Sequence, residues 1–142
     1  MKVSITQIKG ISFVGKGDTN HWVSIDSPRE FSGSEAGARP KELLLLALGG
    51  CTASDVVSIL QKKKTLVQSI DINVHAEVQD QIPKVFTKIH VEYVFYGKDL
   101  NNKNMERAIE LSQDKYCPIT AMIRKACPIS HSYKVLEKKS QD

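Results

Sequence analysis

The chain has 142 residues, of which 41% are hydrophobic and 25% charged, and its formal net charge is +4. These values are typical of one soluble globular domain and exclude a disordered or collagen-like chain. The longest apolar run covers residues 43–48, and the N-terminus lacks the apolar block of a signal peptide. We therefore expect a cytoplasmic protein without a membrane partner. Scattered basic residues and only 6% aromatic residues also argue against a nucleic-acid partner.

Alternating polar and apolar residues with glycine turns predict three short strands in the first thirty residues, the last over His21–Asp26. A loop rich in glycine and serine follows over residues 32–39. Pro40 then starts a helix that should run to about Lys63, because proline suits the first helical position. Residues 43–48 are apolar on every side, so we expect this helix to be buried all round.

Two further segments, 69–78 and 85–95, alternate strictly and predict a hairpin that turns through residues 81–83. Asn101 or Asn102 can cap a second helix ending near Lys115. A third helix is expected from Pro118 through 126, and a last strand over 129–137. The resulting order, βββ-α-ββ-αα-β, predicts the α+β class with largely antiparallel sheets, in one domain spanning residues 1–142.

The apolar central helix needs cover on all sides, which a chain of this length supplies on one side more easily than on two. The simplest solution is a homodimer in which two such helices pack together. We therefore expect a homodimer.

The three cysteines, Cys51, Cys117 and Cys127, are too few and odd in number for a disulfide framework. Cys51 follows two helical glycines, which cost about 1 kcal/mol each relative to alanine. Either a neighbouring segment packs closely there, or the thiol needs open space. Cys117 precedes Pro118 and is expected at a helix N-cap, where the thiolate is favoured. The alternative is a buried cysteine that acts as a small hydrophobic residue.

Other candidate ligands carry weaker signals. Cys127 is expected to be structural. The spacing of Cys127 and His131, with Cys117 nearby, could suit a metal, but no tight cysteine pair is present. We therefore predict no metal site and no cofactor. His75 and His90 fall on the polar faces of their strands and are expected to be solvated.

Several motifs together resemble one known family. The central helix carries Gly49-Gly50-Cys51-Thr52-Ala53, and Tyr116-Cys117-Pro118 follows at the family's spacing. Arg39-Pro40-Lys41-Glu42-Leu43 is similar to the family's helix start. On these residues the chain resembles the OsmC/Ohr family, the osmotically inducible and organic hydroperoxide resistance proteins. Two further segments, 55–62 and 129–133, are similar to its OsmC-like branch rather than to true Ohr.

The resemblance implies an intertwined homodimer with active sites at the subunit interface. It implies that Cys51 is the peroxidatic and Cys117 the resolving cysteine of a peroxidase acting on organic hydroperoxides in oxidative stress defence. Cys51 would become a sulfenic acid and condense with Cys117 to a disulfide. A dithiol partner of lipoyl or thioredoxin type would reduce that bond.

The chain departs from the family around the reactive thiol. The family's glutamate, ten residues before the reactive cysteine, is replaced by Lys41, and Glu42 is one helical step late. The early loop offers Lys16 where the family has an arginine. Arg29 and Arg39 are further candidate cations without a motif match.

Asp55 lies one helical turn after Cys51 and is expected to raise the pKa of its thiol. These departures keep a second hypothesis open: a binding protein that holds a lipid or other apolar ligand at the dimer interface, with weak or no peroxidase activity.

Overall fold

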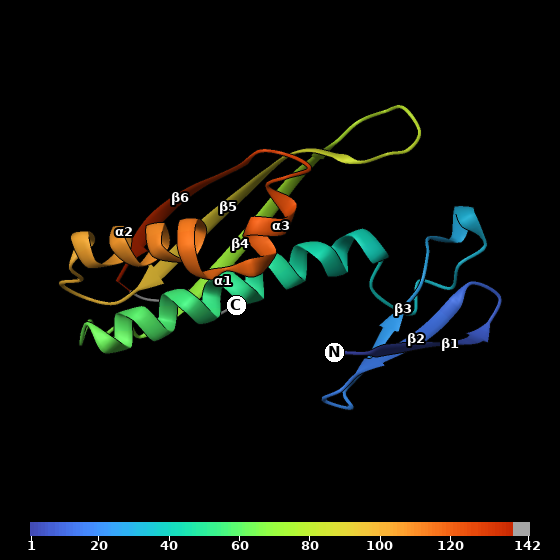
Figure 1. Ribbon diagram of the computed structural model, residues 1–142, viewed down its shortest axis with the longest axis horizontal. Coiled ribbons are helices and arrows are strands. Elements are labelled where there is room, and N and C mark those ends of the chain that lie inside the picture. The colour runs from blue at the N-terminus through green and yellow to red at the C-terminus, as the bar shows by residue number, and fades with distance from the viewer. Residues whose placement is uncertain (138–142) are drawn as a thin grey trace. The chain divides into compact units, whose positions relative to one another are not determined.

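A computed structural model describes residues 1–137 (Figure 1). The chain forms two compact units, one from Met1 to Leu45 and one beginning at Leu46. The order of strands and helices is the one that the sequence predicts, with a π-helical turn added between the second and third helices. The α+β class is therefore confirmed.

The first unit is an antiparallel sheet of β1 (Val3–Lys9), β2 (Ser12–Gly17) and β3 (Trp22–Ile25), in that order. A loop with one 3-10 turn, η1 (Arg29–Phe31), leads from β3 to the first helix. The buried carboxylate of Asp26 organises this loop. It accepts hydrogen bonds from the backbone N–H groups of Ser27, Ser34 and Ala36 and from the Ser12 hydroxyl.

The second unit contains a sheet in the order β4 (Ser69–Val78), β5 (Phe86–Tyr96), β6 (Ile129–Leu136). β4 and β5 form the expected antiparallel hairpin. β6 pairs with β5 in parallel, because the chain between them crosses back through two helices before it re-enters the sheet. This connection carries α2 (Asn102–Leu111), the π-helical turn η2 (Ser112–Tyr116) and α3 (Pro118–Ile123).

Helices cover one face of this second sheet. In α1 (Pro40–Lys62), the hydroxyl of Thr52 contacts that of Tyr93 on β5. On the same face, the Tyr133 hydroxyl of β6 donates to Glu106 of α2, at 2.8 Å. The alternating residues of β5 that point to this side, Ile89, Val91, Tyr93 and Phe95, are fully buried and form the core. The opposite face carries polar residues such as His90 and Glu92.

The boundaries of the connection differ from those expected. The second helix ends at Leu111 rather than near Lys115, because the Cys117 N–H bonds the carbonyl of Ser112 at 2.9 Å and opens a wider π-helical turn. The third helix ends at Ile123, and the last strand ends at Leu136. Asn101 caps α2 as predicted, since its side chain accepts from the Asn104 N–H.

The expectation that the central helix is buried all round is wrong for the chain taken alone. Leu48 is fully buried, whereas Leu44 is 44% and Leu46 is 64% exposed. By length and composition α1 could cross a membrane, although the core helix of a water-soluble protein passes the same test, so this evidence is weak. Within the second unit, the buried residues Leu48, Thr52, Val56 and Leu60 follow one side of the helix, and Leu46 lies on the other side.

Candidate functional site

Two of the three cysteines meet in the second unit. The Sγ atoms of Cys51 and Cys117 and a carboxylate oxygen of Asp55 all lie within 4.8 Å of one another. Cys51 and Asp55 are one turn apart on α1, and Cys117 stands between η2 and α3. Cys117 is only 3% exposed, while Cys51 and Asp55 are half-buried. The site thus holds one accessible and one enclosed thiol beside a carboxylate.

Backbone N–H groups at the start of α3 point at both sulfur atoms. Cys117 is the N-cap of this helix, as predicted, and its Sγ accepts from the Thr120 N–H at 3.3 Å. The Ile119 N–H donates to the Cys51 thiol. Pro118, at the first helical position, has no N–H to satisfy. The sequence Cys-Pro at this helix start therefore places two donors on the thiol pair.

The environment of Cys51 disfavours its thiolate. Burial, with the Cys117 thiol as the next cause, raises the pKa of Cys51 to about 11. The Ile119 N–H opposes this rise, and the negative charge of Asp55 adds to it, as the sequence predicted. At neutral pH the described surroundings of Cys51 therefore favour the protonated thiol.

A directed chain of hydrogen bonds holds Asp55 in place. The Ser112 hydroxyl donates to Asp55 Oδ2 at 3.0 Å, since an ionised carboxylate only accepts. Ser112 must then accept from Thr52, at 2.8 Å, and Thr52 from the Tyr93 hydroxyl. Tyr93 in turn accepts from the Gln113 side-chain amide at 2.7 Å. Each hydroxyl gives its single proton toward Asp55, so the chain has one direction.

The sequence analysis missed the four residues that lead to Asp55 in this hydrogen-bond chain: Thr52, Tyr93, Ser112 and Gln113. Only Tyr93 had a sequence feature that could have predicted a buried hydrogen bond. It falls on the apolar face of a strand, and a buried tyrosine hydroxyl almost always finds a partner. Nothing in the local pattern identified that partner, because Thr52 and Ser112 come from distant elements.

The two helical glycines before Cys51 have different surroundings. A Cβ on Gly49 would lie 3.2 Å from the Val74 side chain of β4, so this glycine allows close packing on the sheet. A Cβ on Gly50 would meet nothing within 4 Å. The close-packing alternative is thus confirmed at Gly49, whereas open space beside the Cys51 thiol stays a prediction.

Five of the candidates for tuning the thiolate belong to the first unit, and one of them, Arg29, pairs with Glu35 at 3.4 Å. Glu42 accepts from the Arg39 N–H at 2.9 Å and so forms half of a capping box at the start of α1. Lys16 donates to Asn20 at 2.8 Å and stacks over the Trp22 ring. Lys41 lies in the first turn of α1. An effect of Lys16, Arg39, Lys41 or Glu42 on Cys51 stays a prediction.

The remaining candidates lie outside the thiol site. Cys127 is buried, as expected of a structural residue, and neither it nor His131 belongs to the thiol–carboxylate group. The His90 ring is not simply solvated. Its two nitrogens lie 2.9 Å from the Ser130 hydroxyl and 2.8 Å from the Ser132 hydroxyl.

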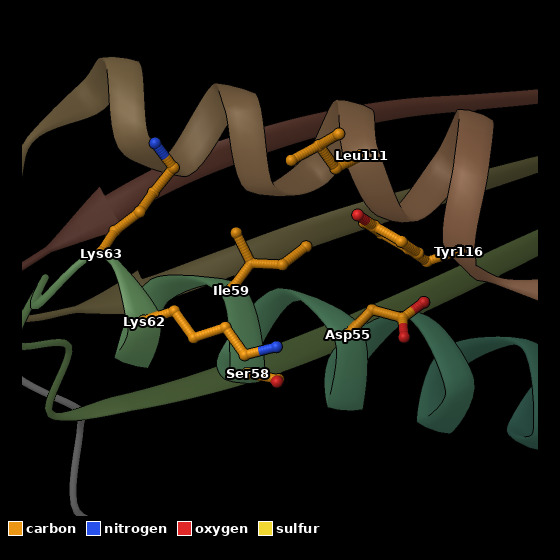
Figure 2. A pocket seen from close by; sticks show the side chains of 7 residues that line it. All are labelled: Asp55, Ser58, Ile59, Lys62, Lys63, Leu111 and Tyr116. Atoms are coloured by element: carbon orange, nitrogen blue, oxygen red, sulfur yellow. The ribbon is translucent and has the colours of Figure 1, made fainter.

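A pocket of about 390 Å³ opens beside Asp55, between α1 and the end of α2 (Figure 2). Its lining mixes apolar and charged side chains: Asp55, Ser58, Ile59, Lys62, Lys63, Leu111 and Tyr116. Tyr116 directly precedes Cys117. The pocket therefore gives small molecules a route from solvent to the carboxylate of the thiol site.

Comparison with known proteins agrees with this architecture. Residues 32–132 match the family model described as OsmC-like protein. The chain belongs to the OsmC family. Protein YhfA of Escherichia coli K12 is 36% identical over 136 residues, covering 96% of this chain and 98% of YhfA.

Solved structures give the same result. A hypothetical protein from Aquifex aeolicus VF5 has a TM-score of 0.84 at 30% identity and covers 97% of each chain. An organic hydroperoxide resistance protein OsmC from Legionella pneumophila has a TM-score of 0.70 at 16% identity, covering 95% of this chain and 98% of its own. The OsmC fold is thereby established.

Proposed function

We propose that this protein is a thiol peroxidase that reduces organic hydroperoxides with Cys51 and Cys117. The observation that carries the proposal is the approach of the two sulfur atoms to within 4.8 Å. A thiol pair at this distance needs only small side-chain movements to close a disulfide. The half-buried Cys51 suits attack on a peroxide, and the enclosed Cys117 suits resolution.

The proposed cycle has three balanced steps. Cys51 attacks the peroxide ROOH, breaks its O–O bond, and yields a sulfenic acid and the alcohol ROH. The Cys117 thiol then condenses with the sulfenic acid, forming the disulfide and releasing water. A dithiol of lipoyl or thioredoxin type restores both thiols by exchange and leaves as its own disulfide.

We further propose that the working form is a homodimer in which α1 packs against its copy. Leu46 and Val57 support this, since they are exposed apolar side chains on one side of α1, opposite its buried residues. Light scattering should give a particle mass of twice 15.8 kDa. A particle of 15.8 kDa would contradict the dimer.

The decisive experiment follows peroxide consumption by the purified protein with a dithiol reductant. We expect faster loss of tert-butyl hydroperoxide than of hydrogen peroxide. Turnover should fall to the reductant blank in Cys51→Ser and Cys117→Ser. Cys127→Ser is the matched control, because it removes a buried free thiol outside the site. Activity that survives in Cys51→Ser would refute the peroxidase.

A binding protein for a small apolar ligand remains the second candidate. The raised pKa of Cys51 and the pocket beside Asp55 favour it. A ligand that copurifies with the protein, seen by native mass spectrometry, together with no peroxide turnover, would establish this function instead.

A further inference from the structure

The thiol site has the composition of a metal site as well as of a redox site. Cys51, Cys117 and Asp55 each offer one ligand atom, and the three atoms lie within 4.8 Å of one another. Two thiolates and a carboxylate form a donor set that zinc accepts, whereas magnesium and calcium prefer oxygen ligands alone.

The spacing of these atoms fits a tetrahedral ion. With Zn–S bonds of about 2.3 Å, two thiolates on a tetrahedral zinc stand roughly 3.8 Å apart. The observed upper limit of 4.8 Å therefore requires a contraction of no more than about 1 Å. Rotation of the Cys51 and Asp55 side chains on one face of α1 can supply this.

The groups around the three donors are those that support metal ligands. N–H groups of Ile119 and Thr120 donate to the two sulfur atoms, and such bonds stabilise metal-bound thiolates. The Ser112 hydroxyl donates to one oxygen of Asp55, and its place in the directed chain fixes the orientation of that carboxylate. Hydrogen bonds from groups of the second unit thus orient the two sulfur atoms and the carboxylate oxygen.

The site also has a route from solvent. Asp55 lines the pocket of about 390 Å³ (Figure 2), so an ion can reach this carboxylate from solvent. Three protein ligands leave a fourth tetrahedral position for water, whereas structural zinc sites have four protein ligands.

In contrast to the sequence-based prediction of no metal site, we propose that Cys51, Cys117 and Asp55 bind one borderline-soft divalent cation such as Zn²⁺ when both thiols are reduced. Binding breaks two S–H bonds, forms two Zn–S bonds and releases two protons to solvent, with no electron transfer. A bound ion occupies both sulfur atoms, so metal binding and disulfide formation exclude each other.

The test titrates Zn²⁺ into the reduced, metal-free protein in competition with a chromogenic chelator, without peroxide. We expect one ion per chain. Loss of a hydrogen bond that supports a ligand lowers metal affinity roughly 10- to 100-fold. Cys51→Ser and Cys117→Ser each remove a ligand, so each should lower the affinity for Zn²⁺ by more than this. Asp55→Asn should lower it by at least about tenfold. Cys127→Ser is the matched control and should leave it unchanged.

A second measurement needs no variant. Co²⁺ should give a tetrahedral visible spectrum with thiolate-to-metal charge-transfer bands, and excess Mg²⁺ should not displace it. The proposal is overturned if the wild-type protein fails to bind Zn²⁺, or if Cys51→Ser binds Zn²⁺ with the same affinity as the wild type. Unchanged affinity in Asp55→Asn would also overturn the three-ligand site. Peroxide turnover, assayed separately with a chelator, can succeed or fail independently.

Discussion

The loop around Asp26 and the site around Asp55 each place a carboxylate inside one unit of the chain, and their surroundings are opposite. Asp26 accepts from three backbone N–H groups and a serine hydroxyl, and these bonds, led by that of Ser27, lower the pKa of its carboxyl. Asp55 faces two thiols and contributes to the raised pKa of Cys51. A carboxylate that donors surround stabilises a loop, whereas one beside a thiol opposes the ionisation of that thiol.

The largest expected effect tests the Asp55 side of this comparison. Because the pKa of Cys51 is about 11, its thiolate fraction should rise about tenfold per pH unit, or roughly 1,000-fold between pH 7 and pH 10. Alkylation of Cys51 by iodoacetamide, quantified by peptide mass spectrometry after brief pulses, measures this rise. A rate that levels off near pH 7 would mean that a cation outside the described surroundings activates the thiol.

A smaller change should follow from removing the charge of Asp55. Asp55→Asn should lower the pKa of Cys51, because a nearby negative charge no longer opposes thiolate formation. Each unit of pKa gives about a tenfold faster alkylation at pH 7.5. Asp80→Asn changes an exposed carboxylate of the same unit and should have no effect. Equal rates in both variants would remove Asp55 from the control of Cys51.

Next in size is the stability carried by the hydrogen-bond chain behind Asp55. Ser112→Ala removes the donor to Asp55 and a partner of the buried Thr52 hydroxyl. The free energy of unfolding should fall by about 1–3 kcal/mol, the usual cost of a buried polar group left without its partner. Urea denaturation measures it, and Ser54→Ala, an exposed serine of α1, is the control. An unchanged midpoint would mean that water replaces the lost bond.

The smallest effect concerns Asp26. Its pKa is lowered on folding, so its stabilising contribution is present above the unfolded pKa of about 3.9 and is lost as pH falls through the folded value. Amide exchange in the loop over residues 27–36 should accelerate in Asp26→Asn at neutral pH. Asp18→Asn, an exposed carboxylate of the same unit, should leave it unchanged. Unchanged exchange in Asp26→Asn would show that the loop holds without this charge.

Much of the fold was accessible from sequence because its signals are local. Pro40 and Pro118 mark helix starts, Asn101 caps α2, and strict alternation gives the β4–β5 hairpin. The π-helical turn was missed because it depends on one bond between the carbonyl of Ser112 and the N–H of Cys117. No local pattern encodes such a bond.

The site was predictable in part. The Cys-Pro sequence predicted that Cys117 is the N-cap of α3, and the i, i+4 spacing predicted that Asp55 lies beside Cys51. The hydrogen-bond chain from Gln113 to Asp55 joins residues of α1, β5 and η2. These residues are distant in sequence, so only the tertiary fold brings them together.

The parallel pairing of β6 with β5 bears on when the thiol pair forms during folding. Cys117 lies on the connection between these two strands, and β6 is the last element among residues 1–137. Parallel pairing across a long connection is a slow, non-local event. The far end of the segment bearing Cys117 is anchored only when β6 joins the sheet. Because Cys51 precedes Cys117 and β6 follows both, we expect the thiol pair to form only after β6 has been synthesised and has joined the sheet.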